Sequence, residues 1–141
     1  MLTVDNILIE EQNNKITNLY FEKNTYKYYS MLLMKAYSQL EAYLAGQLFE
    51  FDLPLYLKGT DFQMSVWKEM MNIPYGKTLT YKQLAEKKNS KAVRAVGNAC
   101  GKNPIPIIVP CHRVVGFNSI GGYSSGLNIK KELINIEKIK Y

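Results

Sequence analysis

Residues 80–101 read TYKQLAEKKNSKAVRAVGNACG and carry the strongest indication of fold in the chain. Thr80 can cap a helix over 81–87, because its side-chain oxygen can accept a hydrogen bond from the first turn. Ser90 can cap a second helix, over 91–101. Two short helices joined by a tight turn form a helix-turn-helix, whose second helix usually enters a DNA groove. The pattern alone is equally compatible with an ordinary antiparallel helix pair.

Helical signals continue on both sides of this stretch. Thr60 or Asp61 can cap a helix that carries apolar residues over 62–70. A last helix is predicted over 130–138, with apolar residues on one side that can dock it. Together these elements predict a mainly helical, winged-helix-like domain over 58–141.

The first 57 residues have different signals. They predict, in order, a hairpin with strands over 3–9 and 16–21, a helix over 30–47 and a strand over 49–53. A boundary falls near residues 57–60. The predicted fold class is therefore α+β, with a small N-terminal α/β domain over 1–57 followed by the helical domain.

The composition is that of an ordinary globular protein, with 47% hydrophobic and 21% charged residues. We recognise no secretory signal, and no apolar run approaches the roughly 20 residues that a membrane helix needs. Cys100 and Cys111 fit neither a disulfide scaffold nor a CxxC metal or redox pair. We therefore expect no membrane association and a reducing compartment, the cytoplasm.

The net charge of +6 is unevenly distributed along the chain. Residues 1–59 carry five lysines and seven carboxylates, a net charge of −2. Residues 60–141 carry thirteen basic and five acidic side chains, a net charge of +8. A basic half of this kind indicates either a surface that meets a polyanion or simply a lysine-rich solvated surface.

Residues 103–115, NPIPIIVPCHRVV, carry the most reactive side chains. Cys111 directly precedes His112, the only histidine of the chain. A thiol with a pKa of about 8.5 is mostly protonated at neutral pH, and a histidine that takes its proton activates it. A carboxylate can hold the other ring nitrogen; Glu137 is the best-placed candidate, with Glu132 about a turn earlier. Each residue alone is also compatible with a buried structural role.

The segment Pro110–Val114 resembles the active-site signature of the O6-alkylguanine-DNA alkyltransferases. The resemblance covers residues 60–138, whereas the first 57 residues are similar only in coarse layout. Further matching segments are 74–78, 81–85, 94–97, 103–106 and 122–127, with Lys131 and Glu137.

The resemblance implies a reaction that each molecule performs once. Cys111 would attack the alkyl carbon on guanine O6 and become a stable thioether. His112 would activate the thiol through a water, and Glu137 would orient His112. Asn103 would hold the joint between the recognition helix and an active-site strand by hydrogen bonding.

The resemblance also implies how the base reaches the thiol. The damaged nucleotide must leave the stack, because its O6 substituent cannot otherwise enter a protein pocket. Arg94 would fill the gap, and Tyr81 would assist extrusion or protonate the departing guanine. Ser124 would contact O6 and, with Tyr123 and Val114, would line the guanine pocket.

The predicted second helix is poor in bulky side chains. Ala95, Gly97 and Ala99 would let its backbone approach the minor groove, where sequence information is degenerate. The small residues are also compatible with close packing of two helices.

The expected partner is double-stranded DNA containing O6-alkylguanine, bound by a monomer without cofactor or metal, since one histidine and two cysteines cannot supply four soft zinc ligands. Cys100 is expected to be an inert buried thiol. Two alternatives remain: a non-catalytic protein that binds alkylated DNA, and a cysteine hydrolase that uses Cys111, His112 and Glu137.

Overall fold

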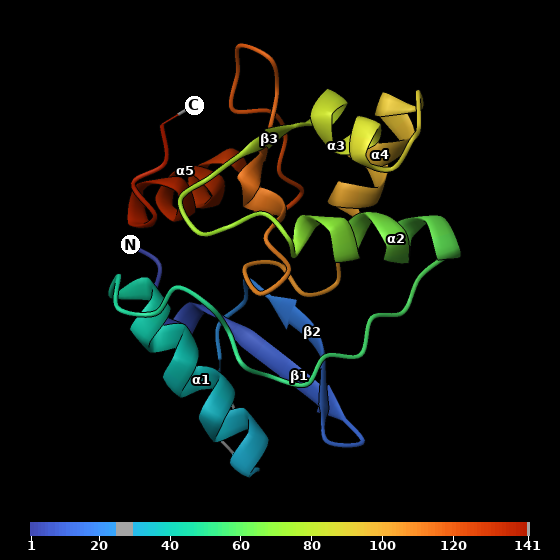
Figure 1. Cartoon of the computed structure of the whole chain (residues 1–141). Helices are drawn as coiled ribbons and strands as arrows, with labels where there is room; N and C mark the ends of the chain where they lie inside the picture. The colour runs from blue at the N-terminus through green and yellow to red at the C-terminus, as the bar shows by residue number, and fades with distance from the viewer. Residues whose placement is uncertain (25–29, 141) are drawn as a thin grey trace.

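The computed structural model describes residues 1–24 and 30–140. Figure 1 shows two parts, one above the other. The lower part holds the hairpin β1–β2 and helix α1, and the upper part holds helices α2 to α5. This mixed helix and sheet architecture confirms the predicted α+β class.

The predicted N-terminal hairpin is present. Strands β1 (Leu8–Gln12) and β2 (Lys15–Tyr20) pair antiparallel, and Asn13 and Asn14 between them have positive φ angles of 52° and 60°. Asparagine tolerates this left-handed conformation better than most residues. The first strand begins later than predicted, because Val4–Asn6 form a 3₁₀ turn, η1, closed by the Asn6 amide on the Thr3 carbonyl.

Helix α1 (Met31–Leu44) confirms the predicted helix. The Ser30 side chain caps it by accepting the Leu33 amide, and Gly46, with φ +75°, follows its end. Its buried face carries Leu32, Ala36, Tyr37, Leu40 and Tyr43.

The predicted strand over 49–53 is wrong. This segment enters no ladder, since residues 49–50 form a bend and residues 51–53 have no regular structure, and the Gln39 side chain hydrogen-bonds both the amide and the carbonyl of Asp52. These backbone groups are therefore satisfied by a side chain of α1. The β contact comes slightly later, where Leu55 forms one bridge with Ile16.

Two helices of the upper part begin with a capping box. In α2 (Asp61–Met70), Thr60 and Gln63 exchange side-chain and backbone hydrogen bonds. In α3 (Tyr81–Lys87), Thr80 and Gln83 do the same, as the sequence predicts for Thr80.

Helix α4 (Val93–Gly101) completes the helix-turn-helix with α3. The predicted cap by Ser90 is wrong, because Ala92 occupies the cap position and no side chain caps the helix. Ser90 instead accepts the Ala92 amide at 3.0 Å, which stabilises the turn before the helix.

The last elements position the reactive segment. The 3₁₀ turn η2 (Cys111–Arg113) leads into β4 (Val114–Val115), which pairs parallel with β3 (Leu79–Thr80). Helix α5 (Leu127–Ile136) begins three positions earlier than predicted, and Glu137 is its C-cap residue.

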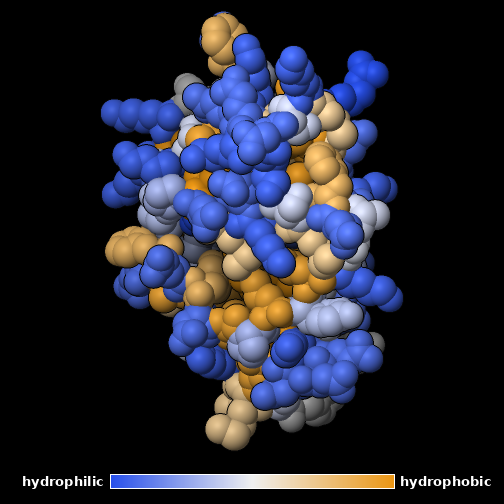
Figure 2. Space-filling view, turned by 45° about the vertical axis from the view of Figure 1, so that its right-hand side comes forward, coloured by the Kyte–Doolittle hydropathy of each residue, from blue (hydrophilic) through white to orange (hydrophobic). Residues whose placement is uncertain are grey.

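One hydrophobic core extends through both parts. Trp67 of α2 is 1% exposed and donates to the Ala99 carbonyl of α4 at 2.8 Å. The Leu19 amide of β2 donates to the Pro104 carbonyl at 3.0 Å. Figure 2 shows an apolar band across the middle of one face, between hydrophilic areas above and below. Among the described residues, no helix is long and apolar enough to cross a membrane.

Candidate active site

Six of the predicted site residues line one hollow of about 700 Å³ between α3, α4 and the loop that follows β4. They are Tyr81, Arg94, Gly97, Cys111, Tyr123 and Ser124. Cys111 also borders a smaller hollow of about 360 Å³, which Tyr123 and Ser124 share and which extends to Asn103. Cys111 therefore borders both hollows.

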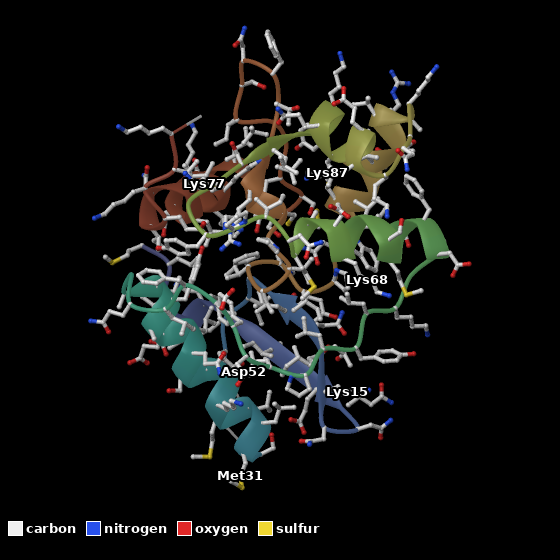
Figure 3. All side chains as sticks on the ribbon, viewed as in Figure 1. Lys15, Met31, Asp52, Lys68, Lys77 and Lys87 are labelled. Carbon is white, nitrogen blue, oxygen red and sulfur yellow. The ribbon has the colours of Figure 1, made fainter. Side chains whose placement is uncertain are left out.

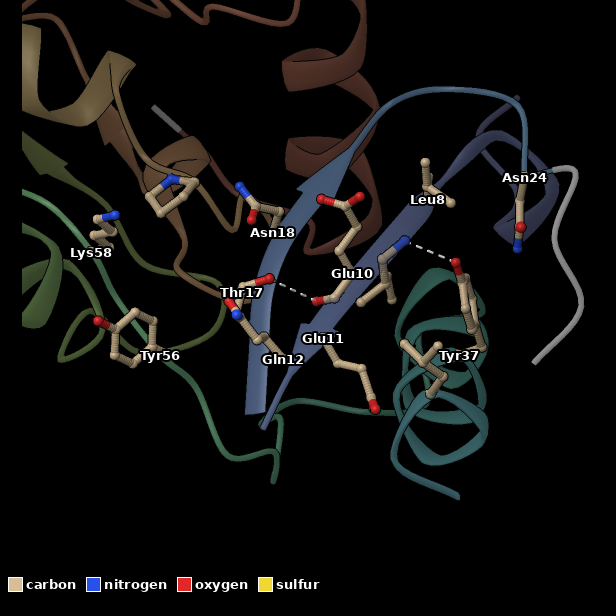
Figure 4. Close-up of a pocket in the computed structure, with 13 residues that line it drawn as sticks. Leu8, Glu10, Glu11, Gln12, Thr17, Asn18, Asn24, Tyr37, Tyr56 and Lys58 are labelled. Carbon is tan, nitrogen blue, oxygen red and sulfur yellow. Dashed lines mark hydrogen bonds between the residues drawn. The ribbon is translucent and has the colours of Figure 1, made fainter. Parts of the chain in front are cut away.

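A separate hollow of about 660 Å³ lies against the N-terminal hairpin (Figure 4). Its lining holds no cysteine or histidine. Two of its polar side chains are engaged with the hairpin itself: the Tyr37 hydroxyl accepts the Ile9 amide, and Thr17 donates to the Glu10 carbonyl. Its chemistry gives no reason to place a reaction there.

Cys111 is 8% exposed and opens the 3₁₀ turn η2. The thiol therefore lies in this turn, before β4. Pro110, immediately upstream, lacks the amide that a strand ladder needs. Burial raises the pKa of the Cys111 thiol, although hydrogen bonds from Asn103 and Tyr123 and the Lys130 charge act in the opposite direction. The resting group is a thiol and needs a base.

Asn103 fixes the segment that leads to the thiol. Its side-chain amide donates to the Val109 carbonyl at 2.7 Å, and its oxygen accepts the Ile105 amide at 2.9 Å. One side chain thus closes the loop between α4 and η2.

His112 is completely buried and contacts Glu137 through Nε2. Burial lowers the pKa of His112, and the hydrogen bond that His112 donates to Glu137, together with the negative charge of Glu137, acts in the opposite direction. Its Nδ1 is buried and has no hydrogen-bond partner among the described residues. A carboxylate on Nε2 favours the proton on that nitrogen, so Nδ1 carries the lone pair. Nδ1 is therefore the atom that can accept a proton.

Glu137 is the centre of a buried polar cluster. Arg113 donates to it through Nε at 2.9 Å and Nη2 at 3.1 Å, and the Gly76 amide donates at 2.9 Å. Tyr43 donates from α1 at 2.5 Å. Burial alone would raise the pKa of Glu137, but the bonds from His112 and Arg113 lower it to about 2. Glu132, the alternative candidate, instead accepts the Leu2 amide at 2.6 Å.

Lys130 is a buried cation that the sequence interpretation missed. Its ammonium group donates to the Val114 carbonyl at 2.7 Å and to the Gly122 carbonyl at 2.9 Å. Burial lowers the pKa of Lys130 to about 8. These bonds attach α5 to β4 and to the loop that carries Tyr123. Its position among the other lysines of the chain gave no signal of burial.

Val114 does not line either hollow at Cys111. Its side chain is completely buried in β4, where it belongs to the core. Its carbonyl, bound to Lys130, is the group that contributes to the architecture of the site.

The outer face of α4 carries the predicted DNA contacts. Arg94 and Ala95 are exposed, and Gly97 faces the hollow. A Cβ atom added at Gly97 would meet only the Tyr81 ring, at 3.8 Å, which is an ordinary contact. Tight helix packing therefore does not require this glycine, which favours the interpretation that it keeps the helix surface open. The exposed Lys87 lies on the same part of the molecule (Figure 3).

Tyr81 stands between the helix-turn-helix and the loop after β4. Its hydroxyl accepts the Gly122 amide at 3.2 Å, and its ring lies 5.9 Å from the Lys130 ammonium. Gly121, with φ +78°, leaves room for this tyrosine, because a Cβ there would come within 2.8 Å of the hydroxyl. Among the described residues, no group of three or more metal-ligating side chains is placed to hold an ion.

Comparison with known proteins gives a consistent result. Residues 61–139 match the family model described as 6-O-methylguanine DNA methyltransferase, DNA binding domain. The methylated-DNA–protein-cysteine methyltransferase of Methanosarcina mazei is 46% identical over 133 residues, covering 93% of this chain and 80% of that protein. The Mycobacterium tuberculosis protein of the same name is 52% identical over 105 residues, covering 73% of this chain.

The region that matches this chain spans 64% of the length of the Mycobacterium tuberculosis methyltransferase. The crystal structure of Mycobacterium tuberculosis OGT in complex with DNA superimposes with a TM-score of 0.84 at 42% identity, covering 94% of this chain and 86% of that one. The chain therefore belongs to the methylated-DNA–protein-cysteine methyltransferase family.

Proposed function

We propose that this protein repairs DNA by moving the alkyl group of O6-alkylguanine onto its own Cys111. The observation that carries the proposal is the arrangement of the thiol at a hollow, next to a buried histidine. The unpaired Nδ1 of His112 can take a proton, while Glu137 holds the opposite nitrogen. Relatives that bear the methyltransferase name support the assignment.

The chemistry is a single displacement at carbon. The bond between Sγ of Cys111 and the alkyl carbon forms as the bond between that carbon and guanine O6 breaks. The thiol proton passes to Nδ1 of His112 through a water, and the departing guanine takes up a proton from Tyr81 or from water. Cys111 is itself the acceptor, so the reaction needs no cofactor. The thioether product is stable and has no thiol proton left to remove, so Cys111 is not regenerated and each molecule acts once.

The surroundings of the hollow suit an extruded base. Tyr81 and Arg94 lie at the hollow between the helix-turn-helix and the thiol. In our proposal Arg94 occupies the gap in the duplex, and Tyr81 contacts the flipped nucleotide and assists its departure. Ser124 and Tyr123 bound the guanine on the side of the loop after β4, with Ser124 on O6.

Helix α4 is the proposed recognition helix, with Ala95 and Gly97 letting its backbone approach the minor groove. Chemistry on a single base needs only one copy of the protein, so we propose a monomer. We also place the activity in the cytoplasm, where reducing conditions keep Cys111 a free thiol.

The stoichiometry of repair tests this function. A fixed amount of protein is mixed with increasing amounts of duplex DNA that carries one radiolabelled O6-methylguanine per molecule. The label bound to protein should reach a plateau at one methyl group per protein molecule. Continued turnover beyond one equivalent, or release of the label into solution, would contradict single use and favour a hydrolytic reaction.

Substitution Arg94→Ala tests the proposed role in base extrusion. We expect transfer from duplex DNA to slow by about tenfold or more, because filling the gap offsets part of the unstacking cost of a few kcal/mol. Transfer from a free alkylated base, which needs no extrusion, should keep its rate. Single-turnover rates on both substrates give the comparison, and Lys91→Ala, at an exposed cation outside the hollow, serves as the control. Equal losses on both substrates would refute the role.

A further inference from the structure

A side chain from the N-terminal helix reaches the catalytic cluster. Tyr43 lies near the end of α1, and this end of the helix lies close to α5 (Figure 1). The residue is 1% exposed. Its hydroxyl donates to Oε2 of Glu137 at 2.5 Å and lies 3.2 Å from Nε2 of His112.

The direction of the hydrogen bond follows from the charges. Glu137 is ionised at neutral pH, since its pKa is about 2, and can only accept. Burial and the neighbouring Glu137 raise the pKa of Tyr43, so the hydroxyl keeps its proton and donates it. His112 donates from Nε2 to the same oxygen. Arg113 Nη2 also donates to Oε2, at 3.1 Å, so three donors converge on this oxygen, and Tyr43 is the one among them that comes from the N-terminal part.

The ring of Tyr43 is held independently of its hydroxyl. It packs edge-on against Tyr75, with centroids 6.2 Å apart, and against the His112 ring at 6.4 Å. Phe51 lies on it at 5.4 Å. Replacing tyrosine by phenylalanine would therefore preserve these ring contacts and remove only the bond to the carboxylate.

We propose that Tyr43 is a positioning residue for alkyl transfer, through which the N-terminal part completes the proton-transfer apparatus around Cys111. Tyr43 touches neither the alkyl group nor the base. It fixes Oε2 of Glu137, and this carboxylate in turn fixes the His112 ring with its proton on Nε2 and its lone pair on Nδ1. The inference rests on the proposed alkyl-transfer function.

The proposal has a consequence for the dependence of rate on pH. The charged and titratable groups around His112 are Lys130 of α5, Glu137 at the C-cap of that helix, Arg113 of η2, Cys111 as the preceding residue in sequence, and Tyr43 of α1. Phenylalanine at position 43 leaves the other four unchanged. It removes a donor that withdraws negative charge from Glu137, so the carboxylate becomes a stronger partner for an imidazolium. The pKa of His112 should then rise, and the acidic limb of the rate profile should move to higher pH.

Single-turnover transfer from a duplex with one O6-methylguanine, measured across pH with wild-type protein and Tyr43→Phe, tests this role. We expect Tyr43→Phe to lower the rate constant at neutral pH by about tenfold, and to move the acidic limb upward while DNA affinity is unchanged. Tyr37→Phe is the matched control. It removes a buried hydroxyl from the same helix, one that accepts the Ile9 amide at 2.8 Å. Thermal unfolding measures how much stability each variant loses when its buried hydroxyl is removed.

The outcomes separate the two claims. The positioning role is supported if Tyr43→Phe transfers more slowly and its acidic limb lies at higher pH. In Tyr37→Phe the rate constant and the acidic limb should both equal those of wild-type protein. A wild-type rate and limb in Tyr43→Phe would overturn the positioning role, and so would equal rate losses in both variants at equal loss of stability. If wild-type protein transfers no methyl group, the proposed function itself fails, whatever the variants do.

Discussion

Substitution Cys111→Ala is expected to abolish alkyl transfer while leaving binding to alkylated duplex DNA intact. In the proposed reaction this sulfur accepts the alkyl group, and none of the other described residues that line the hollow combines a nucleophile with a neighbouring base. The change removes one buried atom and leaves the exposed face of α4, including Arg94, unaltered. Transfer of a labelled methyl group and fluorescence anisotropy with a lesion-containing duplex measure the two properties.

The second cysteine supplies the matched control. Cys100 lines the same hollow, but its thiol contacts Sδ of Met70 at 3.5 Å, and burial raises its pKa to about 12. Cys100→Ala should therefore retain transfer. Residual transfer in Cys111→Ala would contradict the proposal that Cys111 accepts the alkyl group. So would loss of transfer in Cys100→Ala alone.

Substitution Glu137→Gln is expected to slow transfer by about a hundredfold or more and to destabilise the fold. An amide can donate to Nε2, which would move the histidine proton to Nδ1 and remove the lone pair that serves as the base in the proposed reaction. The change also leaves the Arg113 charge buried without its partner, which typically costs about 3–5 kcal/mol. Single-turnover rates and urea unfolding measure the two effects.

The same carboxylate predicts a pH dependence of stability. The pKa of Glu137 in the folded protein is about 2, below its ordinary value of 4.5, so the ionised form is favoured by folding. This contribution, on the order of 3 kcal/mol, is fully present above about pH 4.5 and is lost as pH falls toward 2. Glu137→Gln should lack this part of the acid dependence. Glu132→Gln makes the same change in α5 at a half-exposed carboxylate. This variant should keep the acid dependence of stability and the wild-type transfer rate. An unaltered acid profile in Glu137→Gln would contradict the assigned charge state.

Local sequence signals predicted the elements well where the deciding contacts are local. The Thr80 cap, the helix-turn-helix and the N-terminal hairpin depend on residues within a few positions of one another. The strand predicted over 49–53 failed because a distant side chain, Gln39, satisfies the backbone of Asp52. Alternation of apolar and polar residues cannot distinguish a strand from an irregular segment held in this way.

The site residues were likewise predictable where the sequence carries a local signal. Cys111 and His112 are adjacent in sequence, and Glu137 was the best-placed carboxylate by sequence context, to which the family resemblance added a role. The partners Tyr43 and Arg113 were not found, because their roles depend on contacts spanning 94 and 24 positions and on burial of charges that usually lie on surfaces. Lys130 was not identified from the sequence for the same reason.

The most direct test is the intact mass of the protein after incubation with a duplex that contains one O6-methylguanine, followed by peptide mapping. We predict one added methyl group per molecule, located on Cys111 within the peptide that carries His112. An unchanged mass together with tight binding to the lesion would contradict alkyl transfer and identify a protein that only recognises alkylated DNA.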